Sequence, residues 1–214
     1  MRDPAVAALP SEHYRAGAAR GDWGNDPAQH DALAALDRIH TALLQPAPRG
    51  GLLGRLLGRS AGDGDAPPGL YLWGGVGRGK TFLIDLFFDA LPFEQKRRTH
   101  FHRFMREVHA QLRAHAGQSD PLASIAREWG RDLRVLVLDE FFVNDIGDAM
   151  LLGRLLERLF AEGVALVTTS NTEPRNLYKD GLQRASFVPA IAQLERHCRV
   201  LHLDSAHDYR LRAL

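Results

Sequence analysis

The sequence is poor in three features, and each absence narrows what the protein can be. It contains one cysteine, Cys198, among 214 residues, so no internal disulfide can form, which fits a reducing cytosol. It contains no apolar run of about 18 residues or more, so we expect no membrane-spanning helix. The charges nearly cancel, with 27 basic against 26 acidic residues, which argues against a protein whose main task is to coat nucleic acid. We therefore expect a cytoplasmic protein with no strong nucleic-acid signal.

The sequence contains enough hydrophobic residues to form the core of one folded domain. Hydrophobic residues make up 45% and charged residues 25% of the chain, the usual balance of a globular protein. Residues 1–25 show no sustained period and predict a loosely ordered arm, whereas Asp26 and Pro27 form a fitting cap and first turn for a helix that runs to Leu44. Three regions follow from these patterns: an N-terminal arm and helix (1–45), a loop rich in glycine and proline (46–69), and a core (70–214).

The loop contains the segment GLLGRLLGR at residues 51–59, which has two interpretations. One is a helix that lies on a membrane surface, and the other is a loop that docks a few leucines. Two arginines give weak support to the first interpretation. Membrane association, if it occurs, would be peripheral.

Beyond Leu70, short apolar runs alternate with longer helical patterns. The run Val135–Leu138 is continuously apolar, as expected of a parallel strand covered on both faces. Alternation of strands and helices predicts an α/β fold with a mostly parallel sheet between two helical layers. Strands are predicted at 70–73, 99–104, 135–138, 164–169 and 199–203.

The strongest motif is GGVGRGKT, which matches the pattern G-x-x-x-x-G-K-[ST] of a phosphate-binding loop. A predicted strand precedes it and an amphipathic helical pattern follows it, as such a loop requires. Its glycines let several backbone N–H groups point at one anion, and the N-terminus of the next helix adds more. Lys80 would reach the β and γ phosphates, and the Thr81 hydroxyl would hold Mg²⁺. The predicted ATP-binding residues are Gly74, Gly75, Val76, Gly77, Arg78, Gly79, Lys80, Thr81 and Phe82.

An acidic pair follows the predicted strand at 135–138. Asp139 would lie at the carboxyl end of this strand, where parallel sheets bind ligands, and would hold Mg²⁺ through water. Glu140 is placed to polarise an attacking water. The adjacent acidic pair favours ATP hydrolysis over a GTP switch. A guanine-reading N-K-x-D motif is also absent after a strand, since SNTEP, the nearest candidate, lacks both Lys and Asp.

A polar strand end at 168–171 predicts a third part of the site. Asn171 is our first choice, and Ser170 our second, for a side chain that contacts the γ phosphate or orients water. The alternative is an Asx turn that only begins the next segment.

Five segments go beyond a general phosphate-binding loop. In chain order they are YLWGGVGRGKT, THFHRFM, VLVLDEFFVNDIGDAM, TSNTEP and LYKDGLQRASFVPAI. Over about residues 26–214 they resemble the AFG-like family of AAA+ ATPases, and most closely its bacterial ZapE group. The resemblance implies a three-layer P-loop NTPase fold, Mg²⁺-dependent ATP hydrolysis and assembly into homo-oligomeric rings. It also implies a protein partner in bacterial cell division, the tubulin-like protein FtsZ, and a place in the cytoplasm or peripheral to the inner membrane at the division site.

The resemblance assigns roles residue by residue. Arg184 in GLQR resembles an arginine finger that projects into a neighbouring subunit's site and offsets charge on the γ phosphoryl group. Gln29 and Asp26 resemble the family's N-terminal segment at the nucleotide's edge. The family continues beyond DYRLR into a helical lid, whereas this sequence ends at Leu214, so we expect a core without that lid. The remaining matches are Lys80 and Thr81 to Walker A, Asp139 and Glu140 to Walker B, and Asn171 to sensor one.

Two further groups of residues have competing interpretations. His100 and His102 alternate in a predicted strand and could begin a metal site, but no cysteine or carboxylate stands at ligand spacing, so we favour a structural role. A loose basic stretch predicts a solvated helix face, with nucleic-acid or partner contact as the alternative. Its members are Arg97, Arg98, Arg103, Arg106 and Arg113.

The sequence as a whole predicts an ATP-hydrolysing AAA+ module that remodels a protein partner. One alternative is a nucleotide-gated adaptor with little turnover, and another is a helicase-loader-like ATPase that acts on DNA. Phosphate release with and without a partner separates the first two. Salt-sensitive DNA binding would identify the third.

Overall fold

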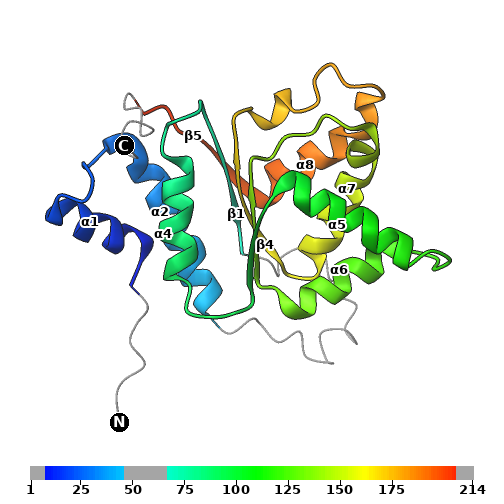
Figure 1. Ribbon diagram of the computed structural model, residues 1–214, viewed down its shortest axis with the longest axis horizontal. Coiled ribbons are helices and arrows are strands. Elements are labelled where there is room, and N and C mark those ends of the chain that lie inside the picture. The colour runs from blue at the N-terminus through cyan, green and yellow to red at the C-terminus, as the bar shows by residue number, and fades with distance from the viewer. Residues whose placement is uncertain (1–7, 46–66, 206–214) are drawn as a thin grey trace, which may run out of the picture.

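The computed structural model describes residues 8–45 and 67–205. Its centre is a parallel sheet of five strands in the order β2-β3-β4-β1-β5 (Figure 1). Strand β1, which leads into the phosphate loop, therefore lies between β4 and β5. The strands are β1 (Gly69–Trp73), β2 (Lys96–His100), β3 (Val135–Asp139), β4 (Ala165–Ser170) and β5 (Cys198–His202).

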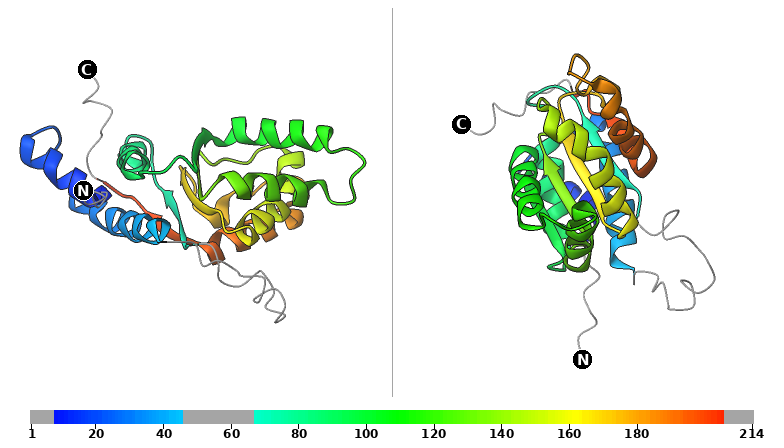
Figure 2. Two further views of the ribbon diagram at one scale, coloured as in Figure 1. Left: turned by 90° about the horizontal axis from the view of Figure 1, so that it is seen from below. Right: turned by 90° about the vertical axis from the view of Figure 1, so that its right-hand side faces the viewer.

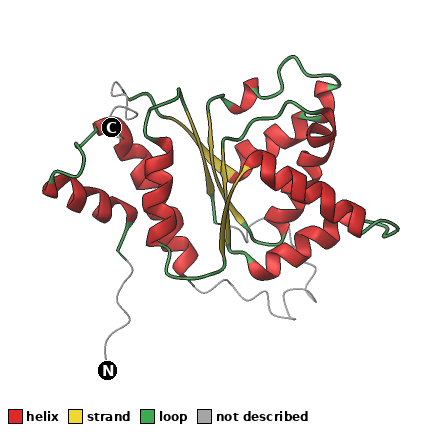
Figure 3. Ribbon diagram, viewed as in Figure 1, coloured by secondary structure: helices red, strands yellow, loops and turns green. Residues whose placement is uncertain are grey.

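Helices cover both faces of this sheet, which is why its central strands are apolar on both sides (Figures 2 and 3). Every residue of β3 and of β4 is buried. In β1, Leu70 and Leu72 join one apolar core and Tyr71 joins the other. One helical layer contains α1 (Pro10–Arg20), α2 (His30–Leu44) and α4 (Lys80–Ala90), and the other contains α5 (Phe101–Ala114), α6 (Pro121–Asp132), α7 (Ile146–Ala161) and α8 (Val188–His197). The prediction of a three-layer α/β fold is confirmed.

The N-terminal region differs from the prediction of a loosely ordered arm. Helix α1 occupies Pro10–Arg20 of this region and begins where the Leu9 N–H donates to the Glu12 carboxylate at 2.8 Å. It ends at Gly21, whose φ of 84° is the left-handed geometry typical of a helix C-terminus. The helix has almost no apolar period because only three of its residues are buried, one of them a glycine. Asp26 does cap the next turn, η1 (Pro27–Gln29), by accepting from the Ala28 N–H.

The strand predicted at 99–104 is also wrong in its bounds. Strand β2 ends at His100, which lies opposite Asp139, the last residue of β3. Beyond that point no strand is available for pairing, and the chain turns into α5, which buries Phe101 and Phe104 on one face. His100 and His102 therefore do not share a strand face, although their rings stack at 6.0 Å.

Two regions with sequence-based expectations lie outside the described ranges: most of the 46–69 loop, with its GLLGRLLGR segment, and the chain after Ser205. Strand β1 begins at Gly69, the last residue of the predicted loop. Within the described part of the chain, no helix is long and apolar enough to cross a membrane.

Candidate nucleotide-binding site

The phosphate loop follows β1 and bends sharply before α4. The Gly74 N–H donates to the Ser170 carbonyl at 3.1 Å, which ties the start of the loop to the end of β4. Gly79 has a φ of 87°, a left-handed conformation that glycine adopts without strain. A Cβ on Gly74 would lie 2.3 Å from the Leu203 carbonyl oxygen, so this position has no room for a side chain. Strand pairing and the lack of a side chain at Gly74 and Gly79 together shape the loop.

Lys80 is the first residue of α4 and lies buried in the loop. Its Nζ donates to the carbonyls of Gly74 at 2.6 Å and Gly75 at 2.7 Å, and to Asn171 Oδ1 at 3.0 Å. Burial lowers the pKa of Lys80, and the nearby Arg78 lowers it further. The structure thus brings two sequence-predicted residues, Lys80 and Asn171, into direct contact.

The acidic pair lies at the carboxyl end of β3. The Asp139 side chain is 12% exposed, whereas the Glu140 side chain is 75% exposed. Glu140 has a φ of 56°, unusual for a residue with a side chain, and its N–H donates to Thr169 Oγ1 at 3.1 Å. Its carboxylate lies 3.7 Å from His100 Nδ1. Strand β4 thus holds Glu140 by the backbone and leaves its carboxylate accessible to water.

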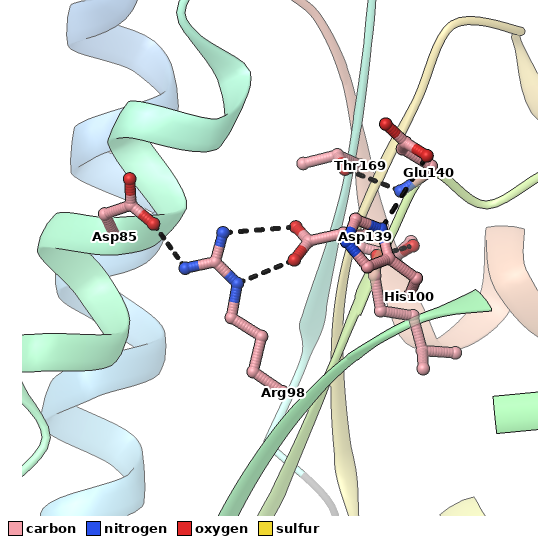
Figure 4. Close-up of polar contacts among 8 residues, drawn as sticks. Asp85, Arg98, His100, Asp139, Glu140 and Thr169 are labelled. Carbon is pink, nitrogen blue, oxygen red and sulfur yellow. Dashed lines mark hydrogen bonds and ion pairs between the residues drawn. The ribbon is translucent and has the colours of Figure 1, made fainter. Parts of the chain in front are cut away.

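Arg98 is a site residue that the sequence analysis missed. It lies on β2, not on a helix face, and its Nε donates to Asp139 Oδ2 at 2.7 Å, with Nη2 3.4 Å from Oδ1 (Figure 4). Its Nη1 forms an ion pair with Asp85 of α4. Burial lowers the pKa of Arg98, but the hydrogen bonds that it donates to the carboxylates of Asp139 and Asp85 outweigh this effect and raise the pKa overall. Its position in RRTH carried no motif, so the only available signal was the strand register that places it beside the end of β3.

The N-terminal segment packs beside the phosphate loop. Trp23 contacts Phe82 in the first turn of α4, with ring centroids 4.9 Å apart. Arg78 donates to the Ser205 carbonyl, and the Ser205 hydroxyl donates to Asp26 at 2.5 Å. Through these contacts the loop, the end of β5 and the η1 cap form one unit. Phe82, predicted to bind nucleotide, lies partly under this aromatic cover.

The other predicted site residues lie apart from these contacts. Val76 is 62% exposed at the tip of the loop. Arg184 begins the short turn η3 (Arg184–Ser186) and donates to the Arg175 carbonyl at 2.6 Å. No contact among the described residues joins Arg184 to Lys80 or Asp139.

The donors present at the site fit a magnesium ion. Mg²⁺ prefers oxygen ligands and usually combines one or two carboxylates with substrate phosphates. Asp139 supplies a carboxylate at the end of β3, and Thr81 supplies a hydroxyl in the first turn of α4. In the part of the chain that the structure describes, no cluster of three or more His, Cys, Asp or Glu residues could hold a metal.

Comparison with known proteins agrees with this geometry. The family described as AFG1-like ATPase matches residues 8–214. The chain is 49% identical over 213 residues to the cell division protein ZapE of Escherichia coli strain K12, covering 96% of this chain and 57% of that protein. The structure resembles that of DnaI, with a TM-score of 0.59 and 18% identity over 88% of this chain and 87% of that one. It also resembles AMPPCP-bound DnaA from Aquifex aeolicus, with a TM-score of 0.56 and 14% identity over 90% of this chain and 52% of that one.

The parallel sheet and the glycine-rich loop define a P-loop protein of the α/β class. Within that class, the chain belongs to the AFG1-like ATPase family. It spans little more than half the length of the ZapE protein that it matches.

Proposed function

We propose that this chain binds ATP with Mg²⁺ in the 74–81 loop and hydrolyses it to ADP and phosphate. The observation that supports this most is the meeting of three strand ends. Lys80 lies in the loop after β1 and contacts Asn171 after β4, while Glu140 after β3 is bonded to Thr169 of β4. A triphosphate in the loop would have a cation, an amide and a carboxylate around its γ phosphate.

Each residue has a definite task in this proposal. Lys80 would exchange its bonds to the loop carbonyls for bonds to the phosphates, which is favourable because phosphate carries full negative charge. Glu140 would polarise a water whose oxygen bonds to the γ phosphorus while the bond to the β–γ bridging oxygen breaks. Asn171 would orient that water or contact the γ phosphate. Mg²⁺, held by Thr81 and through water by Asp139, would supply positive charge against the phosphates.

The proposed role extends to assembly and partners. Arg184 would act on the site of a neighbouring subunit, which requires a homo-oligomer of ring type. The similarity to a cell division protein supports a role in bacterial cell division, in which nucleotide-driven changes remodel a protein partner. The family resemblance suggests FtsZ as that partner, and a cytoplasmic location that includes the inner face of the membrane at the division site.

Two substitutions test the proposed chemistry. Lys80→Ala should abolish ATP binding, because the loop loses its only side-chain cation that points inward to its carbonyls. Glu140→Gln should retain binding and lower phosphate release by about 10²-fold or more, the size of a lost general base. Calorimetry with ATP measures the first effect, and a phosphate-release assay measures the second. Unchanged turnover in Glu140→Gln would remove Glu140 from its assigned role.

A further inference from the structure

Arg98 links the predicted magnesium carboxylate to the helix that follows the phosphate loop. Parallel pairing sets Arg98 opposite Val137, so two-residue alternation turns Arg98, Val137 and Asp139 toward the same face of the sheet. Helix α4 covers that face and contributes Asp85. Figure 4 shows the guanidinium between the two carboxylates.

Arg98 thus pairs with two carboxylates that differ in solvent exposure. The Asp139 side chain is 12% exposed and the Asp85 side chain is 50% exposed. Nε and Nη2 of the guanidinium face Asp139, and Nη1 faces Asp85. Arginine does not lose its proton in proteins, so its charge can only be divided between the two carboxylates.

We propose that Arg98 is a positioning residue that holds Asp139 and thereby sets the Mg²⁺ concentration at which nucleotide binds. This rests on the proposed function, in which Asp139 serves the hydrated ion. Arg98 and Mg²⁺ then compete for the same carboxylate. Asp85 is a second acceptor that keeps the guanidinium paired when Asp139 turns to the ion, so that no charge is left buried and unpaired.

Competition between Arg98 and Mg²⁺ for Asp139 predicts opposite effects of substituting Arg98 and of substituting Asp85. Arg98→Met frees Asp139 and should lower the half-saturating Mg²⁺ concentration for AMPPCP binding by about tenfold, the factor expected for one charge-assisted hydrogen bond. Asp85→Asn leaves the guanidinium to Asp139 alone and should raise that concentration by a similar factor. Calorimetric affinities for AMPPCP over a series of free Mg²⁺ concentrations measure both shifts without any turnover.

Two further variants separate positioning from loss of structure. Arg97→Met is the matched control, because Arg97 is the neighbouring β2 residue and pairs with Glu107 of α5, with Nη1–Oε1 at 2.9 Å. It should leave the Mg²⁺ dependence unchanged. The double variant Arg98→Met with Asp85→Asn should match Arg98→Met alone, because Asp85 acts through Arg98. Thermal unfolding without nucleotide shows whether each variant is folded.

The outcomes discriminate sharply. If the contact of Arg98 with Asp85 and Asp139 were purely structural, Arg98→Met and Asp85→Asn would both raise the Mg²⁺ concentration needed for binding. That result would overturn the inference. So would an effect of Asp85→Asn that persists without Arg98. If the unaltered chain binds no AMPPCP with or without Mg²⁺, the proposed function itself fails. If it binds AMPPCP but shows no Mg²⁺ dependence, the competition is disproved while nucleotide binding stands.

Discussion

Gln29 is a buried residue whose side-chain amide has no hydrogen-bond partner among the described residues. It is fully buried, and neither its amide nitrogen nor its amide oxygen has a hydrogen-bond partner within the described part of the chain. Most buried polar groups nearby are paired, as Asp26 is with the Ala28 N–H. A buried polar atom without a partner costs free energy, because water satisfied it in the unfolded chain.

Replacing this amide should therefore stabilise the nucleotide-free protein. Gln29→Leu keeps most of the volume and removes both unpaired atoms, and we expect the free energy of unfolding to rise by about 1–3 kcal/mol. Urea unfolding followed by circular dichroism measures the change. Gln45→Leu, at an exposed position after α2, should change stability by no more than about 0.5 kcal/mol. A loss of stability in Gln29→Leu would mean that the amide is satisfied.

At the scale of elements, Trp23 makes one of the contacts that hold helix α1. The Trp23 indole N–H donates to the Tyr14 carbonyl at 2.9 Å, and its ring packs over Gly17 and against Phe82. Gly17 is the residue that permits this approach, because a Cβ there would lie 2.0 Å from the indole ring. The helix thus docks on α4 through an aromatic contact and not through a long apolar stripe.

Adding one methyl group at this contact should detach the tryptophan. We expect Gly17→Ala to lower the free energy of unfolding by about 1–3 kcal/mol, as overpacking does elsewhere, and to shift the Trp23 emission to longer wavelength. The same change in a Trp23→Ala background should instead be neutral or stabilising by up to about 1 kcal/mol, because alanine favours helix over glycine. Equal destabilisation in both backgrounds would show that the tryptophan contact is not the cause.

At the scale of the whole molecule, no hydrogen bond or ion pair among the described residues brings Arg184 to the 74–81 loop of its own chain. Arg98 is engaged by two carboxylates, and Arg184 bonds within its own segment. The proposed trans action of Arg184 therefore makes catalysis a property of the assembly.

Turnover should then depend on protein concentration. We expect phosphate release per subunit to rise with concentration, and Arg184→Ala to lower the plateau by about 10³-fold while retaining ATP binding. Mixing Arg184→Ala with Lys80→Ala should restore part of the activity, because one variant keeps the nucleotide site and the other keeps the arginine. A turnover per subunit that is constant with concentration, or a mixture without any recovery, would argue against action in trans.

Much of the site follows from local sequence. The loop 74–81 needs glycines, a lysine and a threonine at set spacings after a strand, so its chemistry is readable from neighbouring residues. Asp139 and Glu140 follow from a buried apolar strand that ends in acids. By contrast, the strand bounds at 99–104 were mispredicted, because the end of β2 is set by the length of its partner β3 and not by its own alternation.

The sequence by itself determined the class of fold, the phosphate loop and the acidic strand end, because each depends on residues only a few positions apart. Only the tertiary structure decided that the Arg98 guanidinium lies between the carboxylates of Asp85 and Asp139, and that Trp23, after α1, packs on the first turn of α4. Those contacts depend on the order of strands in the sheet and on which helix covers which face. That arrangement is chosen by the burial of the whole chain, which no short stretch of residues encodes.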